Sequence, residues 1–131
     1  MENDQCYEIE TLPELYMYGG SSFQIDAIPY EDDGSRMSEQ NASQCTATLS
    51  VSYLSTISGL GNNGTRVPPV LIKSGNMELD DHNDPFFQFL LIPSDTVNLR
   101  GKFIYQISVE NGNSAAAVSQ GLLNIRMNNN Q

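Results

Sequence analysis

The residue best suited to chemistry is His82, because it is the single histidine of the chain and stands in the acidic stretch LDDHNDP at residues 79–85. Carboxylate, amide and imidazole groups at this density could hold a hard cation. The stretch lacks, however, the spaced Asp, Asn and Gly positions and the final Glu of a calcium loop. We therefore expect Asp80 to Asp84 to form a solvated acidic turn closed by Pro85, with a bound cation as the alternative.

The other patterns that could support catalysis are incomplete. A serine or cysteine nucleophile needs a base, and His82 is the one candidate, yet the chain has neither a nucleophile elbow nor a catalytic cysteine signature. The glycine-rich GLGNNG at residues 59–64 has no Lys-Ser or Lys-Thr after it, which favours a hairpin or loop tip over a phosphate loop. Acidic residues are plentiful, but nothing singles out a catalytic pair. The sequence predicts a protein that is not an enzyme, with no catalytic, cofactor-binding or metal-binding residues and no cofactor.

The charge of the chain limits its partners. The formal net charge is −10, from 16 acidic residues against 6 Lys and Arg, and this would repel a phosphate backbone or an anionic membrane. The longest strongly apolar run, FFQFLLI at residues 86–92, is far below the roughly 20 residues that span a bilayer. The first ten residues, MENDQCYEIE, lack the basic and apolar parts of a signal peptide. We expect an intracellular or unprocessed chain that binds neither nucleic acid nor membrane.

The two cysteines, Cys6 and Cys45, are too few for a disulfide framework. Free thiols are expected in a reducing compartment, and one disulfide is the alternative in an oxidising one. The glycosylation sequons at Asn41 and Asn63 matter only in a secreted eukaryotic chain, so we interpret them as chance occurrences.

Four tyrosines offer a possible binding surface. Tyrosine is flat and amphipathic, so Tyr16, Tyr18, Tyr30 and Tyr53 could line a sugar-binding face. Such residues more often pack against strands or contact other proteins, and the chain has no Trp to strengthen the case for a sugar.

Short alternating segments indicate the fold. Apolar residues recur at every second position in segments 22–28, 46–55, 103–109 and 121–127, as in half-buried strands. The last two are expected to form an antiparallel hairpin. The apolar segment 86–92 suits a strand buried on both faces or at the centre of a sandwich.

Weaker strand candidates lie at residues 7–12, 14–18 and 67–75, and no segment has a persuasive helical period. The chain is therefore expected to be all-β, with long surface loops at 31–45 and 57–66. We expect residues 1–17 to form an N-terminal arm or edge strand, 18–127 the sandwich and 128–131 a disordered tail.

Three stretches carry a resemblance to a known family. They are YGGSSFQIDA at the first clear strand, SDTVNLRGKFIYQISVENG at residues 94–112, and SQGLLNIRM near the end. Together they resemble the immunoglobulin-like β-sandwich domains of phage tail and baseplate-associated structural proteins, and are similar to the N-terminal module of baseplate upper proteins. The residues that match the late-strand and final-strand patterns are Asp95, Thr96, Leu99, Gly101, Phe103 and Tyr105, then Gln120, Gly121, Leu123 and Ile125.

One position departs from the family pattern. Phe103 stands where a Tyr is usual, so the hydrogen bond that such a hydroxyl would make at this corner is expected to be absent. Within the pattern, Leu99 is expected to anchor the connection under the sandwich, and Gly101 to permit a tight turn.

The resemblance implies an immunoglobulin-like antiparallel β-sandwich of about seven or eight strands. It implies a non-enzymatic bacteriophage virion protein of the tail, baseplate, neck or capsid, which docks to other virion proteins and forms a homo-oligomer in a symmetric assembly. Such a protein would stay in the bacterial host cytoplasm until it enters the virion, and its N-terminal segment could add a strand to a neighbour's sheet edge. The alternatives are a carbohydrate-binding or host-receptor-binding module and an accessory domain of a larger hydrolase.

Overall fold

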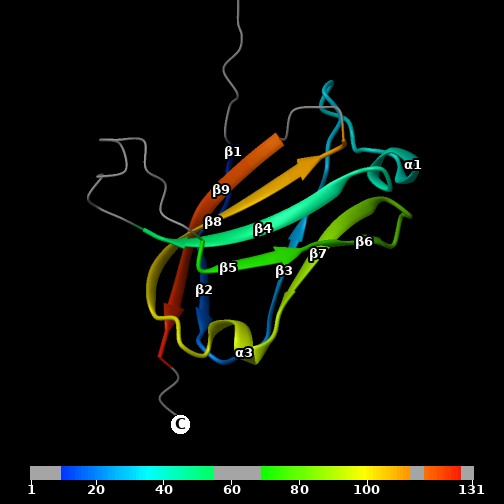
Figure 1. Ribbon diagram of the computed structural model, residues 1–131. Coiled ribbons are helices and arrows are strands. Elements are labelled where there is room, and N and C mark those ends of the chain that lie inside the picture. Colours follow the sequence, from blue (N-terminus) through cyan, green and yellow to red (C-terminus); the bar gives the residue numbers. More distant parts are fainter. Residues whose placement is uncertain (1–9, 55–68, 113–116, 128–131) are drawn as a thin grey trace, which may run out of the picture.

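Two β-sheets make up the protein, as the computed structural model shows for residues 10–54, 69–112 and 117–127. One sheet has six strands in the order β1-β9-β8-β4-β5, with β2 also paired to β9, and is called the large sheet; the three-stranded small sheet has the order β3-β7-β6. Figure 1 shows the course of these strands. The strands are β1 (Glu10–Thr11), β2 (Leu15–Tyr18), β3 (Phe23–Ala27), β4 (Thr46–Tyr53), β5 (Leu71–Ser74), β6 (Asn76–Leu79), β7 (Pro85–Leu91), β8 (Gly101–Glu110) and β9 (Ala117–Arg126).

The arrangement confirms the predicted all-β, immunoglobulin-like sandwich. The pairings of β8 with β4 and β9, and of β7 with β3 and β6, are all antiparallel. The two N-terminal strands are different, since β1 and β2 both run parallel to β9, one after the other along the same edge. Counted as one interrupted edge strand, they bring the described strands to the predicted number.

The core lies between the sheets and follows the alternation in the sequence. On β8 the buried side chains are Phe103, Tyr105 and Ile107, and the cross-strand partners of the last two are Val51 and Leu49 of β4. The small sheet contributes Phe87, Phe89 and Leu91 from its central strand. Burial of one face of every strand is the main source of stability in such a sandwich.

Gly75 marks the place where the chain leaves the large sheet for the small one. It separates β5 from β6, and its amide donates to the Ala47 carbonyl at 2.9 Å. A Cβ at this position would lie 2.8 Å from the Cε1 atom of the Phe89 ring, which is closer than packed carbon atoms come. A residue without a side chain therefore lets the backbone cross directly over the core.

Three expectations about segments need correction. The strand at 86–92 is central in its sheet but is not buried on both faces, because Leu90 is 47% exposed. The segment 31–45 is not simply a surface loop, since it contains the short helix α1 (Glu39–Ala42), where Ala42 is fully buried against the core. The last strand begins earlier than the predicted segment 121–127, because β9 starts at Ala117. The predicted loop at 57–66 and tail at 128–131 lie outside the described residues.

The polar residues in the connection before β8 hold it in place through a hydrogen bond and an ion pair. Helix α3 (Pro93–Thr96) begins after Ile92, whose amide donates to Asp95 Oδ2 at 2.8 Å. The same carboxylate pairs with Lys73 of β5 at 2.8 Å. As expected, Leu99 packs against the core and Gly101 turns the chain with a φ of 114°.

Two residues after Phe103, the hydroxyl of the buried Tyr105 makes a hydrogen bond to a segment that is distant in the sequence. The Tyr105 hydroxyl donates to the Pro13 carbonyl at 2.6 Å, which fixes the connection between β1 and β2 against β8. Phe103, as expected, has no hydroxyl to offer, and its ring lies 4.9 Å from that of Tyr53.

Candidate functional site

The outer face of the large sheet points away from the small sheet. Its side chains alternate with the buried ones, and cross-strand pairs such as Ile104 with Leu122 and Ser50 with Gln106 lie directly side by side. Gln106 and Gln120 also share a hydrogen bond of 3.0 Å between their side chains. The middle of this face consists of Thr48, Ser50 and Ser52 on β4, Ile72 and Ser74 on β5, Ile104, Gln106 and Ser108 on β8, and Val118, Gln120 and Leu122 on β9.

Among the described strand residues of this face, charge is confined to the two ends. Lys102 and Arg126 lie at one end, and Glu110 lies at the other end of β8. Glu14 joins the basic end: its Oε2 accepts a hydrogen bond of 2.7 Å from Asn124. This bond, followed by one from Tyr16, holds the pKa of Glu14 below its ordinary value. The chain has a net charge of −10, and carboxylates occupy much of its remaining surface. The uncharged middle of this face differs from the rest of the surface in this respect.

A second feature is a cleft of about 610 Å³ between β3 and the β1–β2 edge of the large sheet. Buried or half-buried apolar residues, including Ile25, Ile107 and Val109, form its inner wall. Its mouth carries the acidic residues Asp26, Glu31 and Asp32, together with the exposed residues Ile28 and Tyr30.

The cleft exists because the first strands pair with β9 and leave β3 alone at the edge of the small sheet. The order of that sheet gives β3 one neighbour, β7. On its other side, the described part of the chain supplies no backbone partner to Gln24, Ile25 or Asp26. The cleft therefore combines an apolar interior with an open strand edge.

The likeness of this chain to known proteins is weak. No family model matches the chain, and no curated protein matches it. Among solved structures, it is similar to one described as parallel homodimers of the extracellular domains of the voltage-gated sodium channel beta4 subunit, with a role in cell–cell adhesion. The identity is 13% and the TM-score 0.39, over 96% of this chain and 99% of that chain. A likeness of this size supports no argument about function. No helix among the described residues is long and apolar enough to cross a membrane.

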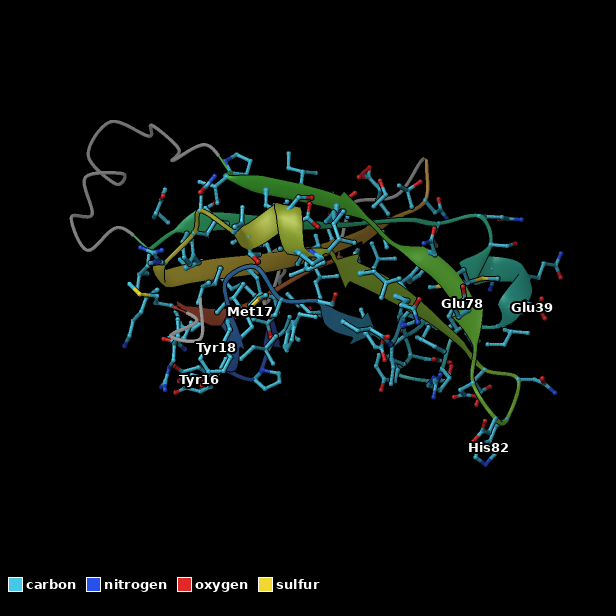
Figure 2. The ribbon with its side chains drawn as sticks, turned by 90° about the horizontal axis from the view of Figure 1, so that it is seen from below. Tyr16, Met17, Tyr18, Glu39, Glu78 and His82 are labelled. Carbon is cyan, nitrogen blue, oxygen red and sulfur yellow. The ribbon has the colours of Figure 1, made fainter. Side chains whose placement is uncertain are left out.

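His82, the strongest candidate for chemistry in the sequence, lies exposed in the turn between β6 and β7 (Figure 2). The turn is organised by Asp80, whose Oδ1 accepts hydrogen bonds from the amides of His82 at 2.8 Å and Asp84 at 2.9 Å. Arg36 pairs with Asp80 Oδ2 at 3.4 Å and donates to the Pro85 carbonyl at 3.1 Å. Within the described ranges, no group of His, Cys, Asp and Glu side chains is arranged to hold a metal ion. The Asp80 carboxylate of this turn thus has a structural use.

The Asp80 carboxylate makes a pH-dependent contribution to stability. Hydrogen bonds from the amides of Asp84 and His82, and then the charge of Arg36, lower its pKa below the usual value. A carboxyl whose pKa is lower in the folded state stabilises the protein above the unfolded pKa of about 3.9, and this stabilisation is lost as the pH falls through the folded pKa. Asp80→Asn should therefore destabilise the protein at pH 7, and its difference from wild type should vanish in acid.

Urea denaturation at a series of pH values tests this expectation. The neighbouring exposed carboxylate, changed as Asp81→Asn, is the control and should alter stability by no more than about 0.5 kcal/mol. A deficit of Asp80→Asn that persists unchanged below the folded pKa would show that the loss does not come from the charge.

Cys45 is a free, half-buried thiol beside Met37 Sδ at 3.8 Å. Burial, and then the charge of Glu31, raise the pKa of this thiol. A raised pKa reduces the thiolate fraction, so Cys45 is a poor nucleophile. Its possible partner Cys6 lies outside the described residues.

The four tyrosines do not form one platform. Tyr16 and Tyr18 share the exposed side of β2, opposite the buried Met17, and the Arg126 guanidinium lies 5.1 Å from the Tyr16 ring centroid (Figure 2). Tyr30 lies at the mouth of the cleft, and Tyr53 at the end of β4. The interpretation of all four as one sugar-binding face does not fit this arrangement.

The outer face of the large sheet could be recognised in the sequence, whereas the cleft could not. The hydroxyl side of TATLSVSY and the uncharged alternate positions between Lys102 and Glu110 were readable as an outer face without charge. The cleft depends on which sheet the first strands join, and no local pattern encodes that choice.

Proposed function

We propose that this protein is a non-enzymatic structural component of a bacteriophage virion that works by protein–protein docking, and that its first partner is a second copy of itself. The resemblance of residues 18–127 to phage immunoglobulin-like domains supports the virion setting. The uncharged outer face of the large sheet is the observation on which the docking function rests.

Charge favours this face for self-association. Two copies that each carry a net charge of −10 repel one another, and the repulsion is smallest where the contact area holds no carboxylates. In a twofold contact with antiparallel β8 strands, the end of one copy that carries Lys102 and Arg126, whose two positive charges exceed the one negative charge of Glu14, meets the Glu110 end of the other. A twofold contact uses the same patch on both copies, so a patch with opposite charges at its ends is complementary to itself.

The size of the face indicates a weak contact. Strands rise about 3.3 Å per residue and lie about 4.8 Å apart, so the regular part of this face covers on the order of 600 Å² per copy. That is below the roughly 800 Å² per partner of a standard stable interface. We therefore expect a dimer that forms at high concentration and that a symmetric virion would reinforce by multivalency.

A carboxylate in the middle of the face should abolish self-association. Gln106→Glu keeps the shape of the side chain but replaces the amide that donates to Gln120 Oε1 with a carboxylate, to which the Gln120 amide can donate after its end group turns over. The change places two like charges close to the twofold axis. Sedimentation equilibrium from about 10 μM to about 1 mM, where weak dimers become populated, should show the wild-type mass rising above 14.5 kDa and the variant remaining monomeric.

Gln88→Glu is the matched control, because Gln88 lies on the central strand of the small sheet and the change in net charge is identical. It should associate like wild type. If both variants associate equally, or wild type stays monomeric throughout, the large sheet is not the contact. The virion setting has its own test: the coding gene should lie among tail, baseplate, neck or head genes, and a position among unrelated genes would contradict it.

Carbohydrate binding is the second candidate function, and one observation favours it. Tyr16 and Tyr18 lie next to each other on the exposed side of β2, where aromatic rings could stack on a sugar. Binding to a glycan array that disappears in a Tyr16→Ala, Tyr18→Ala double variant would support it over the purely structural function.

A further inference from the structure

We propose that the cleft beside β3 takes an extended peptide segment of another protein, with apolar side chains at alternate positions and basic side chains between them. This site is separate from the outer face of the large sheet and does not depend on self-association. The proposal rests on three properties of the cleft: an open strand edge, an apolar inner wall and an acidic mouth.

The open edge supplies the backbone contacts. The free side of β3 presents amide and carbonyl groups to which the described part of the chain gives no backbone partner. Such an edge is a template for one more strand, and main-chain hydrogen bonds give most of the affinity when a peptide adds to it. β3 has five residues, so an added segment of about the same length would use the whole edge.

The inner wall gives a reason for apolar side chains at every second position. Ile25, Ile107 and Val109 belong to three inward-facing positions on β3 and β8 and line the cleft. Side chains of an added strand would alternate between this wall and the solvent. A volume of about 610 Å³ lies within the range of roughly 300–1,000 Å³ typical of ligand sites.

The mouth gives a reason for basic side chains at the positions between. Asp26 and Asp32 are exposed there, and Glu31 is half-buried with a hydrogen bond of 2.8 Å from Asn41 to its Oε2. No Lys or Arg is among the described residues that line the cleft. The negative field therefore favours a basic segment and disfavours an acidic one.

The negative charge at the mouth of the cleft also distinguishes between the segments that could bind there. The N-terminal segment of the chain is a natural candidate for strand addition, but residues 1–10 contain Glu2, Asp4, Glu8 and Glu10 and no basic residue. An acidic segment would meet the acidic mouth with like charge. The occupant is thus expected to come from a different protein.

Synthetic peptides test the proposal on the full chain. The probe is a seven-residue peptide of alternating Lys and Val, with both ends blocked; the comparison peptides are the same composition with the valines together, the Glu–Val analogue, and the probe with its central Val replaced by Pro. Binding is measured by titration calorimetry, and amide shifts and hydrogen exchange locate it. The probe should bind and protect the amides of β3, and the Pro peptide should bind on the order of tenfold more weakly, because it lacks a backbone donor.

Two double variants that remove the same number of charges distinguish a specific effect of the cleft mouth from the general attraction of an acidic protein for a basic peptide. Asp26→Asn with Asp32→Asn removes two carboxylates at the mouth, whereas Glu78→Gln with Asp81→Asn removes two on or beside β6. The first pair should weaken binding roughly threefold to tenfold, as expected for two exposed ion pairs. The second should have little effect.

Three outcomes would overturn the proposal. The first is equal binding of the alternating and rearranged peptides, which would mean attraction by charge alone. The second is binding with unchanged β3 amides, which would place the peptide elsewhere. The third is the absence of binding by any of the peptides. Because the Gln106→Glu variant should bind the probe like wild type, a failure here and a failure of self-association are distinguishable.

Discussion

Phe89→Ala is expected to destabilise the protein by about 3–5 kcal/mol, the usual loss when a large buried aromatic is removed from a core. Phe89 is fully buried on the central strand of the small sheet and lies under the crossing at Gly75. Its removal leaves a cavity between the sheets, which the surrounding structure fills only in part. Since small domains have about 5–15 kcal/mol of stability, urea denaturation should show a loss of about a fifth or more of the total.

Leu90→Ala is the matched control for this change. Leu90 follows Phe89 directly but points to the opposite side of the sheet, where it is 47% exposed. Its truncation should cost much less than that of Phe89. Comparable losses for the two variants would contradict the placement of the core between the sheets.

Thr96→Val should cost about 1–3 kcal/mol, although the two side chains have nearly the same shape. Thr96 is fully buried, and its Oγ1 accepts a hydrogen bond of 3.0 Å from the amide of Gly20. Valine would leave that amide without its acceptor, so the turn between β2 and β3 would lose its attachment to α3.

Denaturation and amide hydrogen exchange measure this effect together. The Gly20 amide should exchange faster in the variant than in wild type. Thr48→Val on the outer face of β4 is the control and should be close to neutral, because valine suits a strand and the Thr48 side chain is partly exposed. Unchanged stability and unchanged Gly20 exchange in Thr96→Val would contradict the assigned hydrogen bond.

Much of the fold could be predicted because each strand carries its own pattern. In β8, the alternation of Phe103, Tyr105 and Ile107 requires one buried face, and the structure buries these three side chains. The polar residues before the strand were recognisable as a motif, but their physical roles were not. Only the structure shows that the Asp95 carboxylate pairs with Lys73 and that Thr96 accepts a hydrogen bond from the Gly20 amide, since these contacts join segments far apart in the chain.

The candidate surfaces were less predictable, because they depend on tertiary choices. The outer face of the large sheet could be read in part from the uncharged alternate positions of β4 and β8. The cleft could not, because it exists only where β1 and β2 join β9 and leave the edge of β3 open. His82 was the strongest candidate in the sequence because of its residue type. In the structure, Asp80 organises that turn by accepting hydrogen bonds from two amides.

Association through the uncharged outer face of the large sheet is tested most directly by amide spectra of the wild-type chain over a dilution series. If the contact is weak, the protein is mostly associated at about 1 mM and mostly monomeric at about 10 μM, so spectra at these two concentrations compare the two states. We predict that shift changes concentrate on β4, β8 and β9, centred on Gln106 and Gln120. Changes confined to the small sheet, or identical spectra at all concentrations, would contradict the claim.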